Sequence, residues 1–149
     1  MPISATCAAL AEQWKASAER ELATADNLRA TGQDWPNVYW HAGFAVEHML
    51  KAVRIKRDGL EVWPASDRGA RWHQLEYIAE RAGLKGEINQ ESSVNLAFGA
   101  NWLTVKDWDQ QRRYPGNAPS EMEARDLLNA VNDPTNGVMT WLLQIYQSL

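Results

Sequence analysis

The sequence predicts an all-α protein: a single domain over residues 1–149 that folds as an up-and-down antiparallel bundle of five or six helices. Apolar residues recur at alternating spacings of three and four along most of the chain, which is the helical period, and no segment alternates like a strand. The connections between these segments are short and carry Pro or Gly, so neighbouring helices should run antiparallel. With 45% hydrophobic residues, a chain of 149 residues is long enough to bury one core.

The first two helices are the longest that the pattern predicts. Apolar residues spaced by three and four predict a helix over residues 3–31, which Gly32 should end. Asp34 is a suitable N-cap, and Pro36 suits the first turn of a second helix, which should end near residues 58–59. The pattern therefore predicts two long helices joined by a tight turn.

Shorter helices are expected after a loop over residues 60–71, a stretch without a sustained period. Ser120 and Glu123 have the spacing of a capping box, which opens a helix. Asp133 followed by Pro134 repeats the signal of a cap and a first-turn proline. The expected helices cover residues 72–82, 87–109, 120–131 and 133–149.

The helix that contains residues 39–59 is apolar over most of its circumference, so it should lie at the centre of the domain. Glu47, Lys51 and Arg54 occupy an arc of roughly 60° on its remaining face. In one interpretation this arc faces solvent, with Glu47 and Lys51 as an i,i+4 ion pair. In the other it is the wall of a polar ligand pocket, where Glu47 bonds to Arg113 and Lys51 lies near a phosphate.

Composition and motifs narrow the function classes. The net charge of −4 gives no global signal for nucleic-acid binding, although residues 51–71 are locally basic. The single cysteine, Cys7, excludes an intramolecular disulfide, and no stretch reaches the roughly 20 apolar residues that span a bilayer. We therefore expect a cytoplasmic protein without membrane association. His41 and His48 are too far apart to share a metal ion on one helix, and no zinc-binding spacing or phosphate loop occurs, so neither metal nor cofactor is expected.

Three short segments stand in a characteristic order along the chain: AVEHMLKA at residues 45–52, HQL at residues 73–75 and RYP at residues 113–115. They resemble the HEPN domain family, whose name stands for higher eukaryotes and prokaryotes nucleotide-binding, and the resemblance extends over about residues 8–145. It implies a helical bundle that commonly forms homodimers. Members of the family include RNA-cutting toxins, partners of minimal nucleotidyltransferases and non-catalytic nucleotide-binding domains.

The ribonuclease members of the family carry an arginine followed, after four to six residues, by a histidine near the start of a late helix. Arg112 or Arg113 stands at the arginine position here, but no histidine follows, and the amide of Asn117 cannot exchange a proton near neutral pH. An arginine and a histidine at the family spacing do occur at Arg68 and His73, before a middle helix. The resemblance therefore implies the family scaffold without its usual catalytic pair.

The primary hypothesis is a non-catalytic HEPN-like module that binds a nucleotide, RNA or a partner protein, as a homodimer in a toxin–antitoxin or phage-defence system. A nucleotidyltransferase or another antitoxin is the expected kind of partner protein. The alternatives are a metal-independent ribonuclease toxin that uses Arg112 or Arg113 with His73, and an assembly scaffold without a ligand. The residues expected to bind the ligand are Glu47, Lys51, Arg54, Arg113 and Tyr114.

Overall fold

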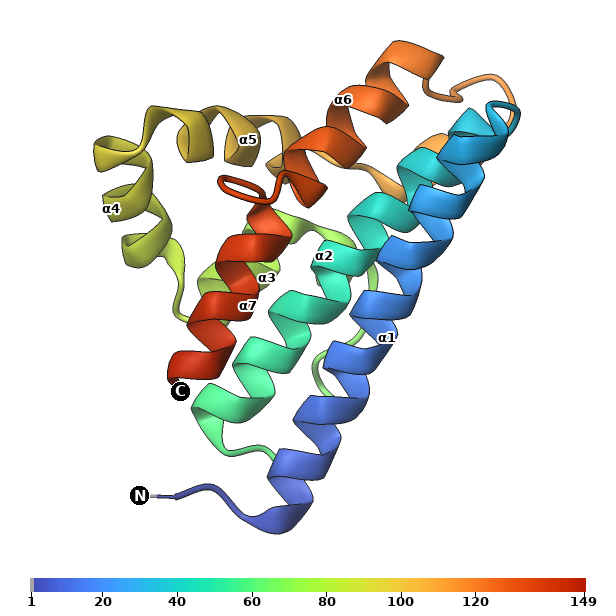
Figure 1. Ribbon diagram of the computed structural model, residues 1–149. Helices are drawn as coiled ribbons and strands as arrows, with labels where there is room; N and C mark the ends of the chain where they lie inside the picture. The colour runs from blue at the N-terminus through green and yellow to red at the C-terminus, as the bar shows by residue number, and fades with distance from the viewer. Residues whose placement is uncertain (1) are drawn as a thin grey trace.

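The computed structural model describes residues 2–149, with the exception of the Arg113 side chain, and this part of the chain is helical without any strand (Figure 1). The all-α class predicted from the sequence is confirmed. The elements are α1 (Ala5–Thr31), α2 (Trp35–Asp58), η1 (Ala70–His73), α3 (Leu75–Arg81), α4 (Lys85–Val94), α5 (Leu96–Lys106), η2 (Gln110–Arg113), α6 (Glu121–Asn132) and α7 (Val138–Ser148), where η marks a 3-10 helix.

The two longest helices, α1 and α2, run antiparallel along much of the molecule (Figure 1). The Ser4 side chain accepts a hydrogen bond from the Cys7 amide and so caps the first turn of α1. Gly32 ends α1 in the left-handed conformation at φ 67°, which costs glycine no steric strain. The predicted pair of long helices joined by a tight turn is confirmed.

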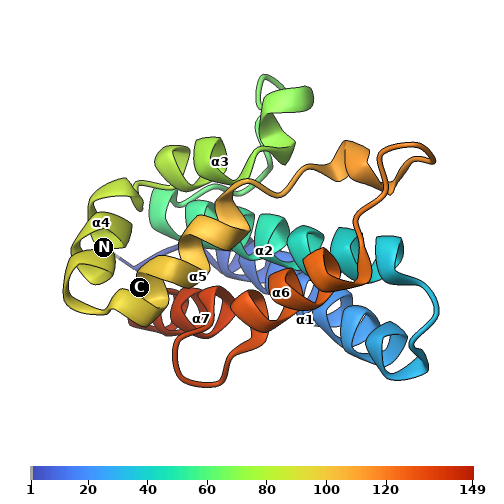
Figure 2. The same ribbon diagram turned by 90° about the horizontal axis from the view of Figure 1, so that it is seen from above.

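Helix α2 is the centre of the fold. It contacts α1, α3, α6, α7 and η2, and Figure 2 shows it lying between α3 on one side and α1 and α7 on the other. Most of its side chains between Val38 and Ile55 are buried, the charged ones included. The prediction that this helix is central and buried on several sides is confirmed, because its many apolar residues are covered by separate elements.

The prediction of a single helix over residues 87–109 is wrong. The structure has two helices in this region, α4 and α5, which are separated at Asn95. The backbone of Asn95 is extended, and its Oδ1 accepts a hydrogen bond from the Phe98 amide at 3.2 Å, which caps the new helix. Gly99 lets α5 lie close to α4, since a Cβ there would be 3.2 Å from the Ser92 carbonyl oxygen. The hydrogen bond to the Asn95 side chain thus replaces a continuous helix by a break and a new N-terminal cap.

Two other boundaries also differ from the prediction. The segment over residues 72–82 is divided at Gln74, whose extended backbone separates η1 from α3. The last helix starts at Val138 instead of Asp133. Asp133 Oδ1 accepts hydrogen bonds from the Thr135 and Asn136 amides, and these bonds close a turn before the helix begins. None of the helices in residues 2–149 is long and apolar enough to cross a membrane.

A close approach between α2 and Trp108 anchors the segment that follows α5. A Cβ on Gly43 would lie 2.2 Å from atoms of the Trp108 ring, so only glycine leaves room for the indole at this point of α2. The indole Nε1 donates a hydrogen bond to the Tyr39 carbonyl oxygen at 3.1 Å. This contact places η2, the next element, directly against α2.

Candidate functional site

The three charged residues of the α2 arc are buried. Glu47 is 1% exposed, and Lys51 and Arg54 are each 7% exposed. The solvent-facing interpretation of this arc is therefore wrong, because other side chains cover it. Trp14 from α1 and the connection over residues 59–74, called the α2–α3 connection below, supply that cover.

Lys51 lies in a cage of one carboxylate and two indole rings. Its Nζ donates a hydrogen bond to Glu47 Oε2 at 3.0 Å, so the predicted i,i+4 pair forms, although inside the protein. The same Nζ lies 5.2 Å from the ring centroid of Trp14 and 5.6 Å from that of Trp63. Cation–π attraction and the ion pair together offset the cost of taking this ammonium group out of water.

Arg54 lies one turn further along α2, between two rings of the α2–α3 connection. Its guanidinium carbon is 5.0 Å from the Trp63 ring centroid and 4.8 Å from the Trp72 centroid. Its Nη1 is 2.5 Å from Asp67 Oδ2, and Trp63 Nε1 donates a hydrogen bond to the Asp67 carbonyl oxygen at 2.7 Å. Arg54 thus holds the connection down on α2 through charge and stacking.

His73 bonds to the other oxygen of the Glu47 carboxylate. The distance from His73 Nδ1 to Glu47 Oε1 is 2.9 Å, and a carboxylate only accepts, so Nδ1 is the donor. In the neutral imidazole this tautomer leaves Nε2 as the acceptor. The side chain of His73 is 35% exposed, so a buried carboxylate orients an imidazole that reaches the surface. The structure thus makes His73 a polar partner of α2 in addition to a member of η1.

The predicted bond between Glu47 and Arg113 stays a prediction, because the Arg113 side chain lies outside the described part of the structure. Glu47 already has a partner on each of its oxygens, namely Lys51 and His73. The assignment of Glu47, Lys51 and Arg54 as ligand-binding residues likewise stays a prediction. Their contacts inside the protein are enough to explain why charged residues stand on this helix.

A surface hollow of about 360 Å³ opens beside His73, and we call it the η1–η2 hollow. One wall comes from η1 and the residue after it, and the other from the segment that Trp108 anchors on α2. Amide, carboxylate and imidazole groups make up most of its polar lining. The lining residues are Ala70, His73, Gln74, Trp108, Asp109, Gln110 and Gln111.

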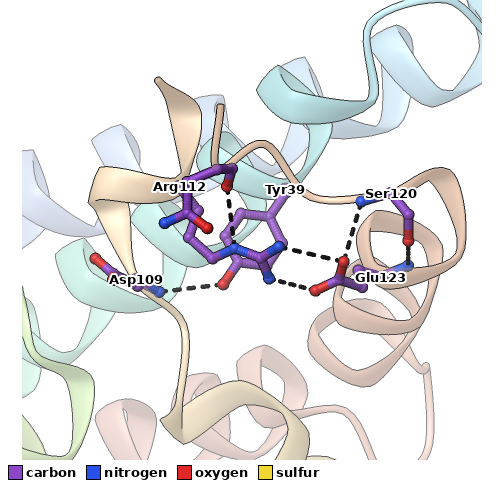
Figure 3. A network of polar contacts seen from close by, with 6 residues as sticks. Tyr39, Asp109, Arg112, Ser120 and Glu123 are labelled. Carbon is purple, nitrogen blue, oxygen red and sulfur yellow. Dashed lines mark hydrogen bonds and ion pairs between the residues drawn. The ribbon is translucent and has the colours of Figure 1, made fainter. Parts of the chain in front are cut away.

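Arg112 ties η2 to the start of α6 (Figure 3). Its Nη2 donates to Glu123 Oε1 at 3.2 Å, its Nη1 pairs with Oε2 of the same carboxylate, and its Nε donates to the Asn117 carbonyl oxygen at 3.2 Å. Glu123 and Ser120 also form the predicted capping box of α6, which is confirmed. The bond from Arg112, followed by that from the Ser120 amide, lowers the pKa of Glu123 to about 2. Arg112 therefore has a structural role, because it joins η2 to the first turn of α6 through the Glu123 carboxylate.

Tyr39 connects this network to the centre of the fold. The guanidinium carbon of Arg112 lies 5.7 Å from the Tyr39 ring centroid, and the Asp109 amide donates to the Tyr39 hydroxyl at 3.1 Å (Figure 3). Burial raises the pKa of the Tyr39 hydroxyl above its ordinary value. Tyr114, just beyond η2, has 58% of its surface exposed and lies at the outside of the same corner. Its role in stacking on a ligand stays a prediction.

The two remaining histidines have separate partners on α1. His48 Nδ1 lies 2.7 Å from Ser17 Oγ, and His41 Nδ1 pairs with Glu21. Burial, followed by the positive charge of Lys51, lowers the pKa of His48 to about 4, so this imidazole is neutral at pH 7. Within residues 2–149 no group of three or more His, Cys, Asp or Glu side chains is arranged to hold a metal ion.

Comparison with known proteins adds no family to this geometry. No family model, curated protein or solved structure matches the chain. The chemically distinctive feature is an imidazole that a buried carboxylate orients at the wall of a polar hollow.

Several residues of this region were not singled out from the sequence. Gln110 and Gln111 line the hollow, and Asp67 holds Arg54, although all three stand in segments without periodic pattern. Gly43 did carry a signal, because a glycine inside a strong helix often marks the close approach of another group. That group is Trp108, which stands near the end of the helix predicted over residues 87–109.

Proposed function

We propose that the chain is an HEPN-like up-and-down bundle whose η1–η2 hollow binds a nucleotide or a short single-stranded RNA segment without cutting it. The observation that carries this proposal is the position of His73. Its Nδ1 is fixed by the buried Glu47, so the other edge of the ring is available at the wall of the hollow. The hollow also lies against η2, the segment where the family resemblance puts ligand-binding residues.

The lining of the hollow suits a nucleobase. Gln74, Gln110 and Gln111 each have a side-chain amide that can donate hydrogen bonds through its nitrogen and accept them through its oxygen. The edges of nucleobases carry both acceptors and donors, so such amides can pair with them. Asp109 adds a carboxylate that can accept from an exocyclic amine. The exposed Arg71, two residues before His73, supplies positive charge for the phosphate.

The absence of cleavage is proposed because Arg112 is occupied. Cutting RNA without a metal needs groups that move protons and a cation that stabilises the charge on the phosphate in the transition state. The guanidinium of Arg112 is bonded to both oxygens of Glu123 and to the Asn117 carbonyl oxygen. A ligand would have to break these bonds before Arg112 could act on it.

The test is a binding titration of the whole protein with adenosine, guanosine, cytidine and uridine monophosphates and with a short RNA, followed by calorimetry. Gln111→Ala should weaken binding by about 2- to 10-fold, the loss of one or two hydrogen bonds. Gln90→Ala, an exposed glutamine on α4, is the matched control and should leave binding unchanged. Absence of binding to every probe, or equal affinity for both variants and the native chain, would overturn the proposal.

The ribonuclease alternative also has a specific observation behind it, namely the pair of Glu47 and His73. A carboxylate that fixes the tautomer of a partly exposed imidazole is the arrangement of a general base. Incubation of RNA with the protein and EDTA separates the two functions. Cleavage by the native chain that His73→Ala abolishes would establish the alternative, while binding without cleavage supports the module. A nucleotidyltransferase or other antitoxin as partner, in a toxin–antitoxin or phage-defence system, is proposed from the family resemblance alone.

A further inference from the structure

The η1–η2 hollow has a negative lining. Among the described residues that line it, Asp109 is the only acidic one, and none is a lysine or an arginine. The nearest basic residues before and after Asp109 in the chain are bonded to other carboxylates. Lys106 pairs with Asp107 at 3.1 Å. Arg112 is bonded to both oxygens of Glu123. A negative lining attracts hydrogen-bond donors and repels phosphate, so the base of a bound nucleotide should enter the hollow with its phosphate outside.

The carboxylate of Asp109 is held in a fixed position. The Asp109 amide donates to the Tyr39 hydroxyl at 3.1 Å (Figure 3), and the preceding residue, Trp108, donates to the Tyr39 carbonyl oxygen. Asp109 Oδ1 accepts a hydrogen bond from the Gln111 amide at 2.9 Å, and within the described residues Oδ2 accepts none. An ionised carboxylate has about four acceptor sites. Both oxygens of Asp109 therefore keep lone pairs that a ligand can use.

A carboxylate distinguishes the bases by the donors that stand side by side on their Watson–Crick edges. Guanine presents N1–H next to the N2 amine, so the two oxygens of one carboxylate can accept a parallel pair of hydrogen bonds, as they do from arginine. Adenine and cytosine present one amine beside a ring nitrogen that accepts, and uracil presents one N–H between two carbonyl oxygens. With these three bases one carboxylate oxygen faces a lone pair and loses its bond. Guanine is therefore the base that a carboxylate matches.

The other groups of the hollow complement the rest of a guanosine. Gln110 and Gln111 follow Asp109 on the same wall, and their amide nitrogens can donate to guanine O6. On the opposite wall His73 donates through Nδ1 to Glu47, so Nε2 of the neutral ring can accept from a ribose hydroxyl. The volume of about 360 Å³ is at the lower end of the roughly 300–1,000 Å³ of small-molecule sites, which suits a single nucleoside.

We infer that the η1–η2 hollow selects guanine, with the two oxygens of Asp109 accepting hydrogen bonds from N1 and the N2 amine of the base. This inference rests on the proposed function, because it names the base that the proposed nucleotide or RNA ligand carries. The side-chain amide of Gln110 or Gln111 donates to O6. The phosphate lies outside the hollow, on the side of the exposed Arg71.

Calorimetric titration with guanosine, inosine and adenosine monophosphates tests the selection. Inosine differs from guanosine only by the missing N2 amine, so it loses one hydrogen bond to a charged group and should bind at least about 10-fold more weakly. Adenosine monophosphate loses both bonds and should bind more weakly still. Equal affinity for the three nucleotides overturns this inference and leaves nucleotide binding established. Absence of binding to every nucleotide overturns the proposed function, and this inference with it.

Asp109→Asn tests the pairing itself, because the amide nitrogen puts a donor where the carboxylate has an acceptor. The amide oxygen can still accept from the Gln111 amide, so the cap of η2 should be kept. Guanine then meets this donor with its own N2 amine. Xanthine has a carbonyl oxygen at that position, so its edge matches the amide. Asp109→Asn should therefore lose at least about 10-fold in affinity for guanosine monophosphate and should bind xanthosine monophosphate more tightly.

Asp107→Asn is the matched control, because it removes the same charge two residues away. The Asp107 side chain is 76% exposed and does not line the hollow, so this variant should keep the preference for guanosine over xanthosine monophosphate. Circular dichroism of both variants confirms that the fold is kept. A guanosine preference that survives Asp109→Asn, or that both variants lose equally, overturns the inference.

A second titration distinguishes a free nucleotide from RNA as the source of the guanine. The probes are guanosine monophosphate, a short oligouridine and the same oligouridine with one guanosine in its middle. The oligonucleotide with the guanosine should bind at least about 10-fold more tightly than the plain one. Higher affinity for it than for the mononucleotide identifies RNA as the ligand, and the reverse order identifies the free nucleotide. Equal binding of the two oligonucleotides, together with no preference among the mononucleotides, overturns the inference.

Discussion

Because Glu47 and Lys51 form a buried ion pair, we expect each single substitution to lower the free energy of unfolding more than the double substitution does. Lys51→Met removes the ammonium group but keeps a side chain of similar length between Trp14 and Trp63. Glu47, at 1% exposure, then has only His73 as its remaining partner. The reverse substitution, Glu47→Gln, leaves the Lys51 ammonium group buried between two rings without a counter-charge.

The magnitude follows from burial. Removing one partner of a buried ion pair costs about 3–5 kcal/mol, because the other charge stays out of water unpaired. His73 can still donate to Glu47, and the two rings still attract Lys51, so we expect the low end, about 3 kcal/mol for each single variant. The double variant Glu47→Gln/Lys51→Met has no buried charge in the pair. It should lose only about 1–2 kcal/mol, the usual cost of one poorly bonded amide.

Urea denaturation followed by tryptophan fluorescence and circular dichroism measures these free energies of unfolding. The matched control is Lys15→Met on α1, where Lys15 and Glu19 also form an i,i+4 pair at 3.0 Å but Glu19 is 52% exposed. This exposed pair should contribute less than about 1 kcal/mol. The reasoning is refuted if Lys51→Met is as harmless as Lys15→Met, or if the double variant loses the sum of the two single losses.

Two further predictions concern the packing and the pH dependence of α2. Gly43→Ala should cost about 1–2 kcal/mol in urea denaturation, because the clash with Trp108 outweighs the gain in helix propensity, whereas Gly86→Ala, which meets no atom within 4 Å, should cost nothing. The pKa of His48 is about 4 in the folded protein against 6.5 when exposed, so the unfolded chain takes up the proton first as the pH falls. Stability should therefore drop by up to about 3 kcal/mol between pH 6.5 and 4. His48→Gln should remove this part of the slope, and an unchanged slope would contradict the assignment.

The helices could be predicted from the spacing of apolar residues, because each helix buries an apolar stripe whose residues recur at the helical period. This spacing did not reveal the division between α4 and α5 because α5 is apolar on both sides, so its spacing continues that of α4. The break depends on one hydrogen bond that Asn95 Oδ1 accepts from the Phe98 amide, which an asparagine inside a helix does not form. The capping box at Ser120 was predictable, since both of its partners lie within three residues.

The polar contacts were predictable only where they are local. The pair of Glu47 and Lys51 follows from i,i+4 spacing, whereas the bond from His73 depends on how the α2–α3 connection folds back over α2. The role of Arg112 shows the same limit. Arg112 meets Glu123 because of the geometry of η2, which carries no periodic signal, so the sequence does not decide between two adjacent arginines.

The central position of α2 has a consequence for how this chain tolerates change. Since α2 contacts α1, α3, α6, α7 and η2, a substitution on almost any side of it disturbs the packing of another element. A saturation mutagenesis screen should therefore give an almost unbroken block of intolerance from Val38 to Ile55, while α4 accepts many polar replacements. Over long divergence such a helix changes more slowly than the elements around it.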